Sequence, residues 1–478
     1  MRDLIGVITG YAAQRLGMHY WVCAVTLARF CVASVCVAAE PAAANVRDLG
    51  MTFRDFSSVN MAGDTERSLY RTALGMNRLE ILWDHLEPEA GKWDQSRLNA
   101  YGSTVLRQNQ NRVRMLVLLA YAARWSAEPG SQVTIGGHPA YISKRHIKHW
   151  VRYVERVVGF LRKPPYNVEY FQVWNEPWKH PQCGFWGGSD DEFFEHVYLP
   201  AAKAIRKLGG RVVYGGWPSC EDLSTWVALM NKHRAWNATD VLSFHYQSGW
   251  NSVWAWPRMR SAAISAGFPD IKIWTTEVGA IVSPAWFADW YTKLFYWAIT
   301  NGGDRDRDLV KAFYFKEQSG PPGNYHFDRS FYQGTRLTKR GQALQVLADL
   351  FSGGPVRGYW EVENDCELSA RIATFGRAAS ATESFLVASK PQRIVTAFQL
   401  LEDEFDPGDR VRLKYPSISK LLRAERIDVA GHAERLTVKR LRRGVEVTVS
   451  TANGSDSPAR GWKVGKLPPF FVVLTFDD

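Results

Sequence analysis

The stretch VRMLVLLA, residues 113–120, decides the fold class, because it is a nearly continuous apolar run of strand length. Such a run is typical of a strand that is buried on both faces, as in a parallel sheet covered by helices. Seven further β-type runs lie on either side of it, and segments with helical periodicity separate them. The predicted strands are residues 49–56, 77–83, 113–120, 168–174, 211–216, 241–246, 271–276 and 309–316.

Eight strands that alternate with helices, such as residues 146–161 and 190–208, predict a (β/α)8 barrel over residues 45–353. A doubly wound open sheet is the alternative, but its phosphate-binding glycine fingerprint is absent from the sequence. Beyond residue 353 the pattern changes to short alternating runs separated by turn residues. This change predicts a small antiparallel β-sandwich over residues 354–478.

The first 44 residues resemble a targeting segment. Two apolar pieces, residues 21–28 and 30–39, flank Arg29 and lead into three alanines at 42–44. Neither piece is long enough to span a bilayer, whereas the second suits the apolar region of a signal peptide. We therefore expect a secreted or periplasmic protein, with cleavage after Ala39 or Ala44. An uncleaved membrane anchor is the alternative, and only then would a membrane be a partner.

The net charge of +11 favours a polyanionic partner, such as an acidic polysaccharide. The sequence contains no recognisable nucleic-acid-binding motif, so we expect no nucleic acid. Twenty Trp and nineteen Tyr residues either fill a large core or provide faces that stack on sugars. Outside the leader, Cys183, Cys220 and Cys366 exclude a complete disulfide framework, while a bridge between Cys183 and Cys220 stays open. No cysteine or histidine spacing suits a metal, and we expect neither metal nor cofactor.

Two carboxylates end predicted strands. FQVWNEPW, residues 171–178, carries Glu176 at the end of the fourth strand, and IWTTEVG, residues 273–279, carries Glu277 at the end of the seventh. Strand C-terminal ends form the active-site mouth of this kind of barrel. A charge after a buried strand is unfavourable unless it is needed. One such carboxylate could be structural, but two indicate a catalytic pair.

A pair of carboxyl groups suits the hydrolysis of glycosidic bonds. The leaving oxygen needs a proton, and the anomeric carbon needs an anionic partner. Two carboxyl groups about 5–5.5 Å apart allow a covalent intermediate, so that the anomeric configuration is retained. Arg78, on the second strand, is placed in sequence to donate to the ionised carboxylate, and Asn175 to donate to a sugar 2-hydroxyl.

Asn175-Glu176-Pro177 on strand four, with Glu277 on strand seven, resembles the clan A glycoside hydrolases. The segment WDHLEPEAGKWD, residues 83–94, is similar to a signature of family 39, and the barrel-then-sandwich layout also fits that family. The resemblance covers residues 46–478. It implies that Glu176 is the general acid/base and Glu277 the nucleophile. It also implies supporting roles for Arg78, Asn175 and His245.

Two departures leave the identity of the sugar open. Clan members often have a tyrosine two residues after the histidine of strand six, where this chain has Gln247. Many also end strand eight on a tryptophan, where this chain has Lys316, which is either a cation that recognises a uronate or an ion-pair partner of Glu317. Tyr246, Trp178 and Trp217 are further candidate sugar-binding residues. Glu87 is expected to be structural and to fix the loop that follows it.

The sequence therefore predicts a retaining glycoside hydrolase that acts on a poly- or oligosaccharide. The positive net charge and Lys316 favour an acidic or mixed exopolysaccharide over cellulose or xylan. Two alternatives remain open. One is a carbohydrate-binding pseudoenzyme of polysaccharide export or biofilm machinery. The other is a transglycosylase, which shares the covalent intermediate.

Overall fold

The computed structural model describes most of the barrel region and parts of the region that follows it. The described residues are 51–60, 68–131, 137–177, 185–217, 223–246, 249–279, 284–298, 306–315, 330–351, 356–361, 363–364, 382–387, 392–398, 410–415, 420–442, 444–450, 456–458 and 470–477. The predictions for the leader, for Trp178, for Lys316 and for all three remaining cysteines lie outside these residues. In the part of the chain that is described, every helix falls short of the length and apolarity needed to cross a bilayer.

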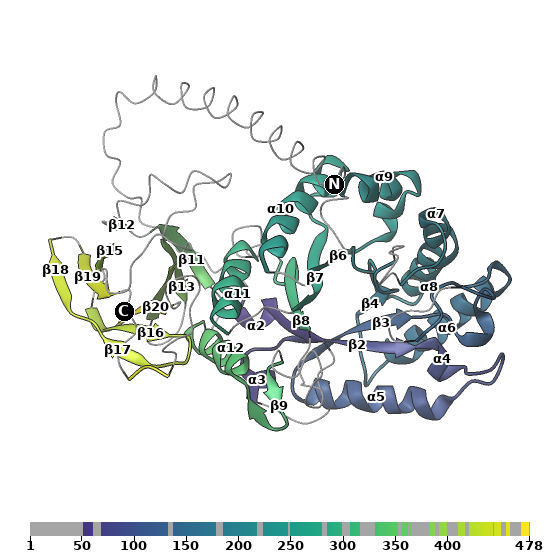
Figure 1. Ribbon diagram of the computed structural model, residues 1–478, viewed down its shortest axis with the longest axis horizontal. Helices are drawn as coiled ribbons and strands as arrows, with labels where there is room; N and C mark the ends of the chain where they lie inside the picture. Colours follow the sequence, from purple (N-terminus) through teal and green to yellow (C-terminus); the bar gives the residue numbers. More distant parts are fainter. Residues whose placement is uncertain are drawn as a thin grey trace, which may run out of the picture. The chain divides into compact units, whose positions relative to one another are not determined.

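Eight parallel strands close into a barrel in sequence order (Figure 1), because β1 pairs with both β2 and β8. This confirms the predicted (β/α)8 fold. The strands are β1 (Ser57–Asn60), β2 (Met76–Leu82), β3 (Arg114–Ala120), β4 (Tyr170–Val173), β5 (Arg211–Val213), β6 (Val241–Tyr246), β7 (Lys272–Gly279) and β8 (Val310–Phe315). One residue from each of β2 to β8 contributes to a buried cluster: Met76, Leu116, Tyr170, Val213, Val241, Trp274 and Phe313. These residues mark which side of each strand faces the barrel interior.

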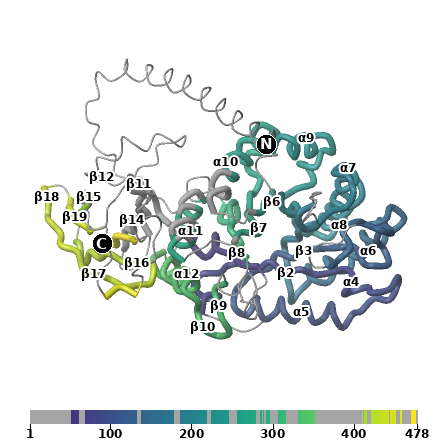
Figure 2. Tube along the Cα trace, in the orientation of Figure 1, coloured from purple at the N-terminus to yellow at the C-terminus, as the bar shows by residue number. Residues whose placement is uncertain are grey.

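Helices connect the strands. Helix α5, which runs along the lower edge of the barrel in Figure 2, contacts β3. The longer helices are α5 (Gln95–Gln110), α6 (Ile147–Leu161), α8 (Leu199–Lys207), α9 (Leu223–Lys232), α10 (Gly249–Ser265), α11 (Pro284–Ala298) and α12 (Lys339–Leu350). Helix α6 shows why these segments pack on the barrel. Its buried residues recur at helical spacing, from Trp150 through Val154 to Leu161, and form one apolar stripe.

The predicted first strand, residues 49–56, is wrong. Residues Phe53–Phe56 form the short helix α2, and β1 begins only at Ser57. The cause is local, since the Thr52 hydroxyl accepts from the backbone of Asp55 and the Asp55 carboxylate accepts from the backbone of Thr52. This capping box satisfies two backbone donors and starts a helix in a stretch whose composition suits a strand.

Other predicted boundaries shift by smaller amounts. The second strand ends at Leu82 because Trp83–Leu86 form the short helix α4. The predicted helix 190–208 is three consecutive pieces, α7 (Asp190–Glu192), a π-helical turn (Phe193–Tyr198) and α8. The fifth strand ends at Val213, ahead of two glycines that matter for the site.

The region after the barrel contains two antiparallel sheets. One has the order β11-β13-β14-β20-β16-β17, and the other β12-β15-β19-β18. The strands are β11 (Val356–Glu361), β12 (Glu363–Asn364), β13 (Thr382–Val387), β14 (Gln392–Phe398), β15 (Arg410–Tyr415), β16 (Lys420–Asp428), β17 (Ala433–Arg435), β18 (Val438–Leu441), β19 (Gly444–Ser450) and β20 (Phe470–Asp477). In β19, buried Val445, Val447 and Val449 alternate with more exposed residues, as expected for a strand with one covered face. These sheets confirm the predicted β-sandwich class.

Candidate active site

The chain leaves β4 through an unusual backbone conformation. Trp174 and Glu176 both have left-handed φ angles, of 66° and 46°. Neither is glycine, so each conformation costs energy that the surroundings must supply. The Glu176 N–H donates to the Gly215 carbonyl over 2.7 Å, and the Trp174 indole N–H donates to the Phe185 carbonyl over 2.8 Å. The turn that carries Glu176 is therefore held from two sides, at the C-terminal end of β4.

A β-bulge in β7 directs Glu277 toward the same place. Phe244 of β6 pairs with Thr275, whereas the next residue, His245, pairs with Glu277, so Thr276 is one residue too many. Trp274 and Thr276 already face the barrel interior. Regular alternation would then point Glu277 outward, and the extra residue turns it inward as well.

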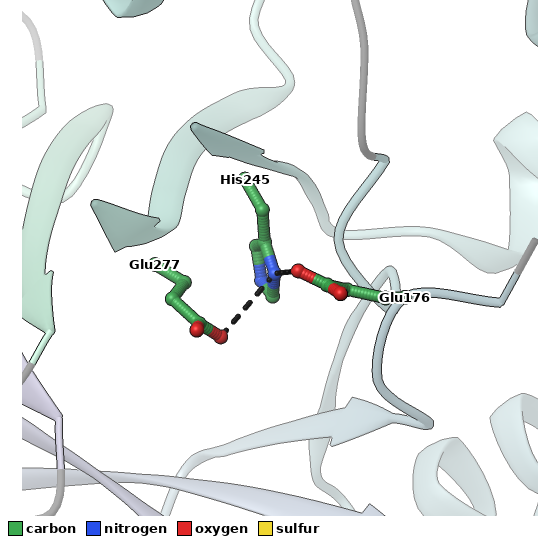
Figure 3. Close-up of side chains that lie close together, drawn as sticks. All are labelled: Glu176, His245 and Glu277. Carbon is green, nitrogen blue, oxygen red and sulfur yellow. Dashed lines mark hydrogen bonds and ion pairs between the residues drawn. The ribbon is translucent and has the colours of Figure 1, made fainter. Parts of the chain in front are cut away.

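Figure 3 shows the carboxyl groups of Glu176 and Glu277 converging on the imidazole of His245. His245 Nδ1 lies 2.8 Å from Glu176 Oε1 and 3.4 Å from Glu277 Oε2. One oxygen of each carboxyl group and one nitrogen of the ring lie within 4.8 Å of one another. The two carboxylates, which are about one hundred residues apart in sequence, thus lie at one end of the barrel at the short separation that direct attack requires.

Glycine and threonine neighbours fix the His245 ring. Gly216 follows β5 with φ of 85°, and a Cβ atom there would overlap with the imidazole. The Thr276 hydroxyl lies 2.9 Å from His245 Nε2 and 2.8 Å from the Ser243 hydroxyl. The backbone N–H of His245 donates to the Trp217 carbonyl over 2.8 Å. The orientation of the ring is therefore set from β5, β6 and β7 together.

Arg78 of β2 joins the carboxylate of Glu277 to a set of side-chain amides. Its Nη1 lies 3.5 Å from Glu277 Oε2. The guanidinium also donates to Gln172 and Asn175, over 2.9 and 2.5 Å, and to Asn60 over 3.3 Å. Asn60 in turn donates to the Thr276 carbonyl over 2.9 Å. Arg78 is therefore held in one orientation in which a positive charge faces Glu277.

Burial changes the ionisation of all three groups at the centre. It raises the pKa of Glu176 to about 7, although the charge of Arg78 opposes the rise. Burial also raises the pKa of Glu277, and the neighbouring His245 and Arg78 oppose this rise only in part. Burial lowers the pKa of His245 to about 3, so the imidazole is neutral near pH 7. Glu176 can therefore hold a proton near neutral pH, beside the Glu277 carboxylate that faces Arg78. This arrangement suits general acid catalysis.

The structure brings Glu176, Glu277, Arg78, Asn175 and His245 together, while their functional roles remain predictions. Trp217 is nearly buried, and its ring lies 6.2 Å from that of Trp226 in α9. Tyr246 closes β6, but its side chain lies outside the described residues. The sugar-binding roles of Trp217 and Tyr246 stay predictions.

Sequence reasoning missed several residues of the site. They are Asn60, Glu80, Gln172, Gly216 and Thr276. The adjacent Gly215 and Gly216 after the fifth strand were a usable signal, since paired glycines at a strand end indicate close backbone approach.

The structural role predicted for Glu87 is confirmed. Its carboxylate accepts from the Trp83 indole over 3.0 Å, from the Gly91 backbone over 2.9 Å and from Arg152 over 2.9 Å. These contacts tie the loop after β2 to α6.

Glu176, His245 and Glu277 also form a group of three potential metal ligands. Their chemistry does not favour a divalent cation there. Arg78 places a positive charge 3.5 Å from Glu277, which would repel a cation bound by that carboxylate. The predicted absence of a metal stays a prediction.

Neither a protein-family model nor a curated protein sequence matches this chain. Solved structures do. A family 39 β-xylosidase from Caulobacter crescentus is similar over 91% of this chain and 98% of its own, with 15% identity and a TM-score of 0.59. The chain has the fold of this enzyme. That finding confirms the expected likeness to family 39, and at this identity it concerns the fold alone.

Two further structures support the same likeness. A family 39 glycoside hydrolase from the gut symbiont Bacteroides cellulosilyticus covers 90% of this chain and 81% of its own, with 16% identity and a TM-score of 0.57. A family 30 endoxylanase from Clostridium papyrosolvens covers 91% and 99%, with 13% identity and a TM-score of 0.56. Each alignment spans nearly the whole of this chain, so the likeness includes the region after the barrel.

Proposed function

We propose that this chain is a retaining glycoside hydrolase, with Glu176 as general acid/base and Glu277 as nucleophile. One observation carries the proposal: a carboxyl oxygen of Glu176 and one of Glu277 lie within 4.8 Å of each other at the C-terminal end of the barrel. The fold likeness to family 39 and family 30 enzymes supports the same reaction class.

The reaction takes two displacements. A carboxylate oxygen of Glu277 attacks the anomeric carbon, while Glu176 transfers its proton to the leaving glycosidic oxygen as the C–O bond breaks. The sugar is then esterified to Glu277. A water molecule gives its proton to Glu176 and attacks the anomeric carbon, which releases the Glu277 carboxylate and restores the proton on Glu176. Two inversions leave the anomeric configuration unchanged.

The surrounding residues support this division of roles. Arg78 faces Glu277 and stabilises its ionised form. Burial keeps Glu176 protonated near neutrality, which a general acid needs. Asn175 accepts from Arg78 through its side-chain oxygen. That contact leaves the amide N–H groups of Asn175 to donate to a sugar 2-hydroxyl.

For the substrate we propose an exported poly- or oligosaccharide, for example a bacterial exopolysaccharide. The net charge of +11 supports an acidic or mixed polymer. The apolar leader supports secretion or export to the periplasm. Sequencing the N-terminus of the mature protein tests the export proposal: residue 40 or 45 at the N-terminus supports cleavage, and an intact leader in the membrane fraction indicates an anchor.

The decisive experiment compares wild type with Glu277→Gln and Glu176→Ala on a panel of polysaccharides and aryl glycosides. Glu277→Gln should lose activity by about four orders of magnitude or more. Glu176→Ala should retain activity on dinitrophenyl glycosides, whose leaving group needs no proton, and azide should accelerate its second step. Glu89→Gln is the matched control, because the Glu89 carboxylate is exposed and pairs only with Lys92 among described residues.

Two other outcomes lead to different conclusions. Sugar binding without turnover in wild type would indicate the pseudoenzyme. Products longer than the substrate at high acceptor concentration would indicate a transglycosylase, which uses the same covalent intermediate. A proton-NMR time course in which the inverted anomer forms first would contradict the assignment of Glu277 as nucleophile.

A further inference from the structure

A third carboxylate, that of Glu80, lies beside the pair and has no part in the chemistry described above. Glu80 follows Arg78 by two residues in β2, and the two residues pair with Leu118 and Leu116 of β3. Residues two apart in a strand face the same side, about 6.6 Å apart along the strand. Arg78 points to Glu277, so Glu80 faces the barrel interior one step closer to the mouth. It is also partly exposed, whereas Arg78 is buried.

Tyr121, just after β3, lies near the Glu80 carboxylate. Burial raises the pKa of Glu80, and the charge of Arg78 and the hydroxyl of Tyr121 oppose that rise. The Tyr121 ring is stacked between His138 and Phe185, with centroid distances of 5.7 Å on each side. Its edge also meets Trp174, the residue at the start of the turn that carries Glu176, at 5.5 Å. A ring packed against three aromatic neighbours holds its hydroxyl in one place, near the Glu80 carboxylate.

Glu80 is not needed as an ion-pair partner of Arg78. The guanidinium of Arg78 is directed to Gln172, Asn60, Asn175 and Glu277. Glu80 nevertheless lies close enough to the centre for its charge to raise the pKa of Glu277. A carboxylate that raises the pKa of the nucleophile is unfavourable for catalysis, which indicates that Glu80 has another role in the site.

The acceptor capacity of Glu80 suggests that role. An ionised carboxylate offers about four acceptor positions on two oxygens. Sugars present pairs of neighbouring hydroxyl donors that such a group can bind together. The same carboxylate would repel the carboxylate of a uronic acid at that position.

We propose that Glu80, near Tyr121, binds two neighbouring hydroxyls of a neutral sugar unit at the Glu176–Glu277 pair and excludes a uronate from that position. The inference rests on the proposed glycosidase function and specifies its substrate. In a mixed polymer, the acidic sugar units would then bind outside the position at the Glu176–Glu277 pair.

The test measures kcat/KM for wild type, Glu80→Gln, Glu80→Ala and Tyr121→Phe. The substrates are an aryl glucoside or xyloside, its monodeoxy analogues, and the glucuronide that matches the glucoside. In wild type, loss of the hydroxyl that Glu80 binds should reduce kcat/KM by about 100-fold or more. In Glu80→Ala the same deletion should cost less than about threefold, because the partner is already gone. Tyr121→Phe should give an intermediate penalty.

The glucuronide substrate tests whether the charge of Glu80 excludes a uronate. Wild type should prefer the neutral glycoside, and Glu80→Gln should narrow that preference by about tenfold or more. Asp84→Asn is the matched control: its carboxylate follows the same strand but pairs with Arg124 at 3.3 Å, so the preference should not change. Thermal melts confirm that each variant is folded. Equal deoxy penalties and equal neutral-to-uronate ratios in wild type and Glu80→Gln would overturn the inference.

The outcome is separable from that of the proposed function. If Glu277→Gln abolishes turnover while both Glu80 variants keep the wild-type preferences, the glycosidase stands and the role of Glu80 falls. If wild type turns over no glycoside, binding of neutral and uronate iminosugars is measured by calorimetry on the same variants. A wild type that binds neutral iminosugars about tenfold tighter than Glu80→Ala supports the inference, and equal affinities, or no binding, contradict it.

Discussion

His245 Nδ1 and Glu176 Oε1 lie 2.8 Å apart, within hydrogen-bond distance, and the His245 ring is buried. Because the imidazole is neutral near pH 7, a single proton lies in this contact, on Glu176 or on the ring. The contact holds the Glu176 carboxyl group toward the barrel mouth, and the neutral His245 ring adds no positive charge beside it. A neutral histidine is thus compatible with an acid whose pKa is about 7, where a charged one would lower that pKa.

We expect activity to fall as the pH rises through about 7, because Glu176 must be protonated to act as an acid and its pKa is about 7. The measurement is kcat/KM against pH for a glycoside with a poor leaving group. Repeating it with a dinitrophenyl glycoside provides the control, since that leaving group needs no proton. A profile for the poor leaving group that is flat up to pH 9 would contradict the assignment.

Replacing Arg78 should shift the acidic limb of the same profile. The Arg78 charge lowers the pKa of Glu277, so Arg78→Gln should raise that pKa and move the acidic limb to higher pH. The kcat/KM at the optimum should drop about 100-fold or more, because the nucleophile loses the donor that stabilises its ionised form. Arg78→Lys keeps the charge but not the planar fork, so it should lower activity with a smaller shift of the limb. An acidic limb at the same pH in wild type and Arg78→Gln would contradict this prediction.

The barrel and the carboxylate pair were predictable for a physical reason. Strands buried on both faces must be apolar along their whole length, so residues 113–120 stand out in the sequence without any knowledge of contacts. A carboxylate placed directly after such a strand, as at Glu176, is costly to bury and therefore indicates function. The first strand was missed because a capping box between Thr52 and Asp55 is a local contact that overrides strand propensity.

The remainder of the site depends on contacts between distant strands. The bulge at Thr276 is a property of the register between β6 and β7, and period-two alternation alone places Glu277 outside the barrel. Gln172 and Asn60 became site residues only because the closed barrel brings β4 and β1 to Arg78 of β2. Glu80 was overlooked although a second charge on the same face of a buried strand is itself a signal.

Gly216→Ala should reduce both activity and stability. The left-handed φ of 85° and the overlap of a Cβ atom with His245 both act against the substitution. Gly130→Ala is the matched control, since Gly130 has φ of 73° but open space around the position of a Cβ atom. Gly130→Ala should cost about 1–2 kcal/mol of unfolding free energy with normal kcat. Gly216→Ala should cost more and also lower kcat, because the imidazole must move. Chemical denaturation and kcat measured on the two variants decide this.

Asp308→Asn should destabilise the barrel without changing its chemistry. Asp308 precedes β8 at the opposite, N-terminal end and contacts Lys311, which is fully buried, at 2.9 Å and Arg114 at 2.8 Å. Removing the charge of Asp308 leaves Lys311 and Arg114 without their anionic partner. This should lower the free energy of unfolding, measured in urea at pH 7, by about 3–5 kcal/mol.

The destabilisation should depend on pH. Burial raises the pKa of Asp308, but hydrogen bonding from Arg114 and the charge of Lys311 outweigh that effect and lower the pKa. Its stabilisation is therefore present above pH about 4 and declines as the pH falls, so the difference between wild type and variant should shrink in acid. Glu169→Gln, which removes an exposed partner of Arg211, should cost less than about 1 kcal/mol. A kcat for folded Asp308→Asn well below wild type would show that the two ends of the barrel are coupled.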